Sequence, residues 1–242
     1  MSGIPARFPK VQAPYERSDN ENGDYTVDPE VMDGYEWVFD RAEEVDAVEK
    51  LHGTNIAVKL EHGDVVDAAT RMGNREMNEL NPFADDANHH YITRGVQNSI
   101  RRGYLYKWNN GWLFGELVGP KFHGNPYELD EHLFIPFDWL REHCSYNSYG
   151  EYSTEFDAIS DWFKEGLFSL FYSRIHGTSL DDARVSNGVF VEGVVFVHPD
   201  FHGRIKTDNL DTYSTASYDA VASELAKLRR DMYDWYDAES NN

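Results

Sequence analysis

Short apolar runs separated by glycine-containing turns fill residues 35–71 and constrain the fold more than any other feature of the chain. In YEWVFDRAEEVDAVEKLHGTNIAVKLEHGDVVDAATR, runs of strand-like composition alternate with Gly-Thr-Asn and Gly-Asp turns. Such runs, bounded by turn residues, are typical of antiparallel strands joined as hairpins or a meander. The sequence therefore predicts antiparallel sheets in this region.

Later segments add further strands and also helices. GWLFGELVG (111–119) reads as a strand, HLFIPFDWL (132–140) as an apolar run, and GVFVEGVVFVHPD (188–200) as a buried strand that contains a glutamate. EFDAISDWFKEGLFSLFY (155–172) has helical spacing and is better explained as core than as a surface that stacks on bases, and GVQNSIRRGYLYKW (95–108) fits a short helix. Together these elements predict an α+β fold.

The two ends of the chain give different patterns. Residues 1–35 are rich in Pro, Asn, Asp and Gly and predict an irregular segment, with at most a short edge strand near Val11. Near the other end, the apolar residues from Val221 to Trp235 are spaced 4, 3, 4, 3, which predicts an amphipathic helix over 217–236. No linker or repeat interrupts the sequence, so we expect a single domain over 1–242.

The composition favours a soluble cytoplasmic protein with no membrane segment. The sequence has no apolar run of about 18 residues, and MSGIPARFPK lacks the apolar region of a secretory signal. Cys144 is the only cysteine, which suits a reducing compartment.

Acidic residues outnumber basic ones 43 to 22, giving a formal net charge of −21 with only eight lysines. Such a chain repels nucleic acid at long range. An acidic, lysine-poor surface is also typical of proteins from a high-salt cytoplasm, where screening removes the self-repulsion. One acid-free stretch, residues 87–115, holds Arg94, Arg101, Arg102 and Lys107. It is either a solvated helix face or a basic strip that meets phosphates.

Two glutamates lie inside apolar strand-like runs, Glu116 in WLFGELVG and Glu192 in VFVEGVVFV. Each either faces solvent or is bound by a partner, because an unpaired buried carboxylate costs several kcal/mol. A lysine such as Lys50 or Lys206 could be that partner. A nucleophilic lysine needs a lowered pKa, which neighbouring cations or a metal provide, while carboxylates can hold a sugar hydroxyl or the metal.

The segment EKLHGTN resembles the nucleophile motif of the covalent nucleotidyltransferase superfamily of ligases and capping enzymes. That motif is Lys-x-Asp/His-Gly, and the chain has Lys50-Leu51-His52-Gly53 followed by Thr54-Asn55. Histidine in the third position, with glutamate before the lysine, is similar to the RNA ligase 2-like branch. The resemblance implies that Lys50 is the nucleophile and that His52 acts in adenylylation, whereas Asn55 is better explained as a turn residue.

Further segments resemble the motifs that follow in this superfamily, in the same order. ATRMGNR implies that Arg71 binds AMP or the RNA end, and FGELVGP implies that Glu116 holds the ribose. LFIPFDW implies that Phe137 stacks on adenine while Asp138 supports the site. VEGVVF implies a metal or phosphate role for Glu192.

The fifth motif departs from the Lys-x-Lys of the family. Aligning GRIK places Arg204 and Lys206 at the two lysine positions, and Lys206 would then contact the α-phosphate. AKLRRDMYDW offers Lys227 as a rival, which would make 203–226 an insertion. The family's lysines lie on a strand, and Lys227 falls in the predicted helix, so we favour Lys206.

The resemblance implies an ATP-dependent RNA ligase that joins 3′-hydroxyl and 5′-phosphate ends through a lysyl-AMP intermediate. The implied fold is a nucleotidyltransferase (ATP-grasp-like ligase adenylation) domain, with antiparallel sheets enclosing the nucleotide pocket and helices outside. ATP with Mg²⁺ or Mn²⁺, RNA ends or a nicked duplex, and a monomeric state are also implied. The nucleotide-binding set is Glu49, Leu51, His52, Gly53, Asn55, Arg71, Glu116, Phe137, Glu192, Arg204 and Lys206.

Two other functions stay open at this point. One is a DNA nick ligase or a GTP-using capping-type enzyme, which His52 and the lack of room for an OB-fold disfavour. The other is a nucleotide-binding protein that does not join ends, which the imperfect fifth motif keeps open.

Overall fold

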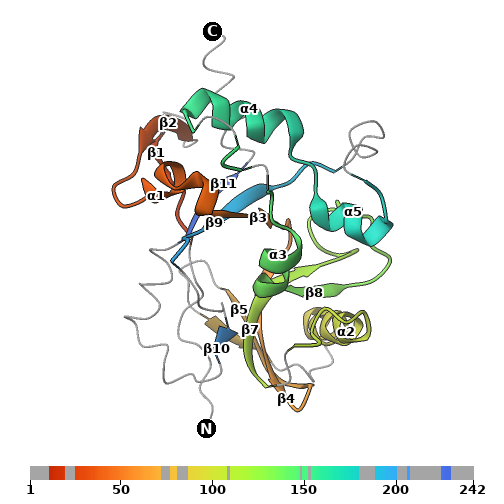
Figure 1. Ribbon diagram of the computed structural model, residues 1–242. Coiled ribbons are helices and arrows are strands. Elements are labelled where there is room, and N and C mark those ends of the chain that lie inside the picture. The colour runs from red at the N-terminus through yellow and green to blue at the C-terminus, as the bar shows by residue number, and fades with distance from the viewer. Residues whose placement is uncertain are drawn as a thin grey trace. The chain divides into compact units, whose positions relative to one another are not determined.

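The computed structural model describes residues 11–19, 25–71, 77–80, 87–107, 110–147, 149–151, 154–179, 189–200, 206–207 and 225–229 (Figure 1). The helices are α1 (Trp37–Asp40), the 3-10 turn η1 (Ala42–Glu44), α2 (Ala87–Arg101), α3 (Phe137–His143), α4 (Phe156–Gly166) and α5 (Leu170–His176). The strands are β1 (Tyr15–Asp19), β2 (Tyr25–Val31), β3 (Asp46–Lys50), β4 (Thr54–Glu61), β5 (Asp64–Arg71), β6 (Met77–Leu80), β7 (Gly111–Val118), β8 (Leu133–Pro136), β9 (Gly193–Val197), β10 (Lys206–Thr207) and β11 (Leu225–Arg229).

Where the sequence predicts one domain, the chain divides into two compact units. Unit 1 comprises Met1–Lys10, Leu51–His143 and Gly203–Val221, and unit 2 comprises Val11–Lys50, Cys144–His202 and Ala222–Asn242. The division passes between Lys50 and Leu51, inside the KLHG motif.

Unit 1 is built on an antiparallel sheet in the order β10-β7-β4-β5-β6, with β8 also paired to β7. The strand predicted over 111–119 is confirmed as β7, and the antiparallel pairing predicted for 35–71 is confirmed for β4 and β5. Helix α2 packs beside β8 and begins earlier than the short helix predicted from 95–108. Mixed helices and antiparallel strands confirm the α+β prediction.

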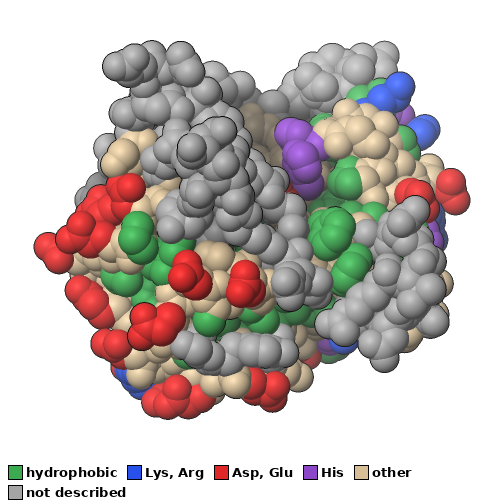
Figure 2. Space-filling view, turned by 90° about the horizontal axis from the view of Figure 1, so that it is seen from above, with side chains coloured by type: hydrophobic (Ala, Val, Ile, Leu, Met, Phe, Trp, Pro, Cys, Tyr) green, Lys and Arg blue, Asp and Glu red, His purple; other side chains and the backbone are tan. Residues whose placement is uncertain are grey.

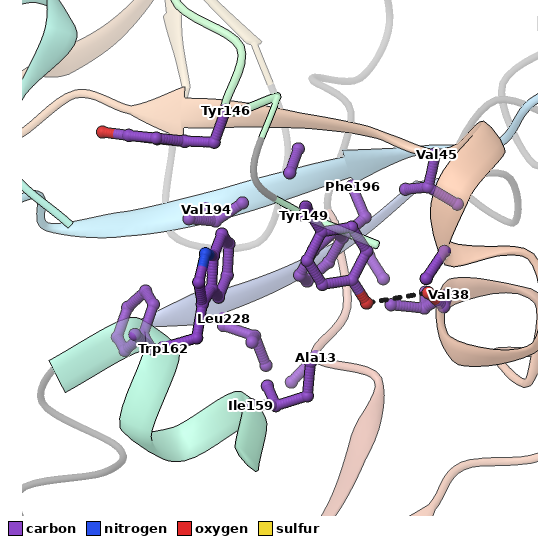
Figure 3. Packing of buried hydrophobic residues seen from close by; sticks show 14 of the residues in the cluster. Ala13, Val38, Val45, Tyr146, Tyr149, Ile159, Trp162, Val194, Phe196 and Leu228 are labelled. Atoms are coloured by element: carbon purple, nitrogen blue, oxygen red, sulfur yellow. Dashed lines mark hydrogen bonds between the residues drawn. The ribbon is translucent and has the colours of Figure 1, made fainter. Parts of the chain in front are cut away.

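Unit 2 is built on a three-stranded antiparallel sheet in the order β11-β9-β3. One face of this sheet forms the core, packed against helix α4 (Figure 3). Helices α4 and α5 confirm the helical spacing over 155–172, and Phe163 and Phe171 within them are buried, as the core interpretation predicts. The hydroxyl of Tyr149 donates a hydrogen bond to the Val38 carbonyl at 2.7 Å, so a buried polar group is satisfied within the core.

The prediction of an irregular N-terminal segment over 1–35 is wrong for residues 15–19 and 25–31, whereas the short edge strand predicted near Val11 agrees with a bridge from Gln12 to Ala226. Strands β1 and β2 pair antiparallel, with Tyr15 opposite Val31. Tyr15 and Val27 are almost fully buried in the core of unit 2. Tertiary packing of a few apolar residues therefore decides this segment, against its turn-rich composition.

The predicted C-terminal helix over 217–236 is also wrong, because residues 225–229 form strand β11. Ala226 and Leu228 point into the core and are fully buried, while Lys227 and Arg229 between them are only partly buried. This two-residue alternation is that of a strand with one face in the core. The remainder of 217–236 lies outside the described residues.

Acidic side chains gather on the face of the molecule shown in Figure 2, where few Lys and Arg side chains are seen. The negative charge of the sequence is thus visible at the surface. Among the described helices, none has the length and apolar character needed to cross a membrane.

Candidate active site

Lys50 is the last residue of β3, and the sheet of unit 2 places it in line with a second cation. Lys50 lies opposite Gly193 of β9, and Gly193 lies opposite Arg229 of β11 on its other side. Directly opposed residues of antiparallel strands share a face of the sheet. Lys50 and Arg229 therefore share the face opposite the core, with no side chain from Gly193 between them.

Glu192, which directly precedes β9, sits between these two cations. Its carboxylate forms an ion pair with the Lys50 ammonium, and the same oxygen lies 4.0 Å from Nε of Arg229. The side chains of Lys50 and Glu192 are only 20% and 16% exposed, so this cluster is largely shielded from water. The interpretation that the sheet turns Glu192 to solvent is therefore wrong, because its carboxylate is paired with the Lys50 ammonium.

Gly193 is required by the close approach of β11 to β9. A Cβ atom at this position would lie 2.2 Å from the carbonyl oxygen of Leu228. Any side chain here would push β11, which carries Arg229, away from β9. The pairing of β9 with β11 thus requires glycine at position 193, whether or not the site binds a ligand.

Lys227 lies on the same face of the sheet as Lys50 and Arg229, two residues before Arg229 on β11. It is opposite Val195, which is opposite Val48, two residues before Lys50 on β3. Our reason for preferring Lys206, that Lys227 would lie on a helix, is therefore wrong. Lys206 lies on β10, opposite Leu113 of β7 in unit 1. Arg204 lies outside the described residues.

Glu49, predicted to bind the nucleotide, has its side chain on the opposite face of β3 from Lys50. The carboxylate is buried and accepts hydrogen bonds from the Ser169 hydroxyl at 2.5 Å and from the Phe171 N–H at 2.8 Å. It thus joins β3 to the first turn of α5. Burial raises the pKa of Glu49 from 4.5 to about 7, although both hydrogen bonds lower it.

The raised pKa of Glu49 predicts a specific pH dependence of stability. Between pH 4.5 and about 7 the folded chain holds a proton that the unfolded chain releases, so this group's contribution to stability is lost as the pH rises through that window. We therefore expect the difference in free energy of unfolding between the parent and Glu49→Gln, measured by urea titration, to change with pH. This parent-minus-variant difference should fall between pH 4.5 and about 7 and then level off. Exposed Glu43→Gln is the control and should show no such trend. If the difference in free energy of unfolding between the parent and Glu49→Gln does not change with pH, Glu49 does not have the raised pKa.

In unit 1, the turn after Lys50 is held by two neighbouring segments. The backbone N–H of His52 donates to the hydroxyl of Tyr127 at 2.7 Å, and the His52 ring lies 4.5 Å from the ring of His123. A Cβ on Gly53 would come within 2.8 Å of the Leu117 carbonyl oxygen, so the turn packs directly on β7. The strand–turn–strand prediction for KLHGTN is confirmed.

Asn55 and Glu116 lie opposite each other on β4 and β7, and the Asn55 amide donates a hydrogen bond to the Glu116 carboxylate. Glu116 is 4% exposed, so the interpretation that it faces solvent is wrong. Asn55 is more than a turn residue, because it orients this buried carboxylate. Sequence reasoning missed this pairing, although both residues had been singled out.

The other predicted residues of unit 1 occupy the ends of elements. Arg71 ends β5, while Phe137 and Asp138 begin α3, directly after β8. Leu51 is fully buried and anchors the start of the turn. Their proposed contacts with a nucleotide stay predictions.

The basic strip predicted over 87–115 is largely neutralised. Arg101 and Arg102 both pair with Glu131, at 2.6 and 2.8 Å, and Lys107 pairs with Glu142. The interpretation as a solvated face fits these three residues. Arg94 has no acidic partner within 4.0 Å among the residues that the structure describes.

The described residues contain no group of three His, Cys, Asp or Glu side chains that could hold a metal by themselves. A magnesium ion that binds substrate phosphates needs only one or two carboxylates and keeps several waters. Glu192 can supply one such carboxylate on the face that carries Lys50. Glu192 therefore fits a metal that is brought with a nucleotide.

Comparison with known proteins identifies the class of this chain. The sequence model of the RNA ligase family matches residues 43–208, which include β3, the KLHG motif and β9. This matched segment includes Lys50 and Glu192, which form the ion pair at the end of β3. The chain belongs to the RNA ligase family.

Several solved structures of Naegleria gruberi RNA ligase are similar to the chain. A mutant with ATP and Mn is 16% identical, with 91% of this chain and 61% of that chain covered and a TM-score of 0.40. The ligase with PPi is 17% identical, with 90% and 62% covered and a TM-score of 0.32. The chain thus spans about three fifths of the length of these structures. No curated protein matches the sequence.

Proposed function

We propose that the protein is an ATP-dependent RNA ligase of the RNA ligase 2-like type, which joins 3′-hydroxyl and 5′-phosphate ends through a lysyl-AMP intermediate. The observation that carries the proposal is the cluster of Lys50, Glu192 and Arg229 on the face of the unit 2 sheet opposite the core. In it, an amine at a strand end lies next to a carboxylate that could hold a metal and near a guanidinium that could bind phosphate.

In the first step, the Lys50 ammonium loses a proton to solvent, and the resulting neutral amine attacks the α-phosphorus of ATP. A nitrogen–phosphorus bond forms, the bond to the bridging oxygen breaks, pyrophosphate leaves, and a second proton passes from the nitrogen to solvent. Before the reaction, Glu192 holds Lys50 at the end of β3. Arg229 and Lys227, on the same face, are placed to stabilise the negative charge that develops on the departing pyrophosphate.

In the later steps the adenylyl group moves to RNA. An oxygen of the RNA 5′-phosphate attacks the α-phosphorus, the nitrogen–phosphorus bond breaks, and Lys50 is regenerated. The 3′-hydroxyl oxygen of the other end then attacks the activated 5′-phosphorus, and AMP leaves. Bound Mg²⁺ or Mn²⁺ would offset the charge of the phosphates.

An end-joining assay tests the proposal. A 5′-phosphorylated RNA strand with a 3′-hydroxyl, incubated with the full chain, ATP and Mg²⁺, should give a joined or circular product on a denaturing gel. The same strand without the 5′-phosphate should give none, because the adenylyl group then has no acceptor. Joining of nicked DNA but not of RNA, or joining with GTP alone, would favour the rival class of enzyme.

A further inference from the structure

Unit 1 carries a surface cluster that differs in charge from the rest of this acidic protein. We call it the cation–aromatic patch, and it consists of His90, Tyr91, Arg94, Lys121, Phe122 and His132. The first three residues lie on α2, and the others lie on the segment 119–132 that connects β7 to β8. His90, Arg94 and Lys121 are exposed, and the three rings of Tyr91, Phe122 and His132 are half-buried.

The rings of this patch form one contiguous group. Tyr91 stacks on His132 with ring centroids 4.5 Å apart, and Phe122 meets the edges of both rings at 6.2 and 5.4 Å. Burial first, and then the nearby charges of Lys121, Arg94 and His90, lower the pKa of His132. Lys121 and Arg94 therefore lie close enough to His132 to lower its pKa, which favours the neutral form of this ring.

Several other cations among the described residues are paired with carboxylates, unlike Arg94 and Lys121 of the patch. Arg41, Lys59, Arg101, Arg102 and Lys107 are each bound to a carboxylate. Arg94 and Lys121 have no acid within 4.0 Å among the described residues. Glu131, next to His132, is engaged by Arg101 and Arg102. Arg94 and Lys121 thus bring two positive charges to the patch, although the chain carries a net charge of −21.

The same connection also reaches the turn that follows the proposed nucleophile. His123, next to Phe122, packs on His52, and Tyr127 accepts the hydrogen bond of the His52 N–H. The patch and this turn therefore belong to one continuous, hydrogen-bonded part of unit 1.

We propose that the cation–aromatic patch binds a single-stranded RNA segment next to the end to be joined, with phosphates on Arg94 and Lys121 and a base against Phe122. This inference rests on the proposed function, which supplies RNA as the ligand. Unstacked bases on aromatic rings, flanked by cations that follow the backbone, are how proteins bind single strands. A duplex, whose bases stay stacked, would leave the rings unused.

Binding of a labelled single-stranded RNA of mixed sequence to the full chain, followed by fluorescence anisotropy without ATP, tests the inference. The double variant Arg94→Gln with Lys121→Gln should bind on the order of 10-fold more weakly at about 0.1 M salt. The slope of log affinity against log salt should shrink by about 1.4, since each phosphate contact to a single strand contributes about 0.7. Phe122→Leu, which keeps an apolar side chain, should lose on the order of 5-fold.

The matched control removes the same charge from ion pairs elsewhere in unit 1. Lys59→Gln with Lys107→Gln should leave RNA affinity within about 2-fold, because distant charges are screened. An unchanged affinity for the Arg94 and Lys121 variant, or an equal loss in both double variants, would overturn the inference. Because ATP is absent, RNA binding through the patch by a chain that never joins ends would refute only the proposed function.

Discussion

Lys50→Ala should abolish the covalent AMP adduct of the protein. After incubation with ATP and Mg²⁺, intact-mass spectrometry of the parent should show one added AMP, and the variant should show none. Without the amine, no atom at the end of β3 can form the nitrogen–phosphorus bond. An undiminished adduct in Lys50→Ala would refute the assignment.

Two further variants separate loss of the nucleophile from loss of the ion pair. Lys50→Arg keeps a cation next to Glu192, but a guanidinium stays protonated and cannot attack phosphorus. It should fold like the parent by circular dichroism and still form no adduct. Lys59→Ala, which removes a lysine bound to Glu61, should form the adduct normally.

Lys227→Ala should lower the rate of Lys50 adenylylation on the order of 10²-fold or more, as expected when one contact to the reacting phosphates is removed. The reason is the position of Lys227 on β11, on the same face as Lys50. Lys206→Ala should change the rate less, because β10 pairs with β7 and not with the strands of the sheet that carries Lys50 and Lys227. The rate is measured with labelled ATP in single-turnover time courses.

Arg229 gives this prediction a matched control. Arg229→Lys restores the Lys-x-Lys pattern of the family on β11 and should keep most of the adenylylation rate, whereas Arg229→Ala should lower it. Thermal unfolding must show that each variant stays folded, because Arg229 also neighbours Glu192. Loss of adenylylation in Lys206→Ala with a normal rate in Lys227→Ala would return the fifth motif to β10.

The nucleophile turn was predictable because its signals are local. Two apolar runs flank Gly-Thr-Asn, and the structure places β3 and β4 on either side of them. The opposite faces of Glu49 and Lys50 also follow from the two-residue period of a strand. What the sequence did not contain was the partner of Glu49, because Ser169 and Phe171 lie about 120 residues away along the chain.

Strand β11 could not be recognised from the sequence for a physical reason. Its residues, Leu-Ala-Lys-Leu-Arg, are all good helix formers, and their apolar spacing continues a helical pattern. Pairing with β9 and burial of Ala226 and Leu228 override that local preference. The match to the RNA ligase family also ends at residue 208, before this strand. The fifth motif was assigned to GRIK because the helical spacing placed Lys227 on a predicted helix.

The most direct test of the account is incubation of the unmodified full chain with labelled ATP or with labelled GTP, followed by denaturing electrophoresis and mapping of the labelled peptide. The account predicts label retained from ATP alone, on the peptide that contains Lys50. Label from GTP alone, label on another residue, or no retained label from either nucleotide would contradict it.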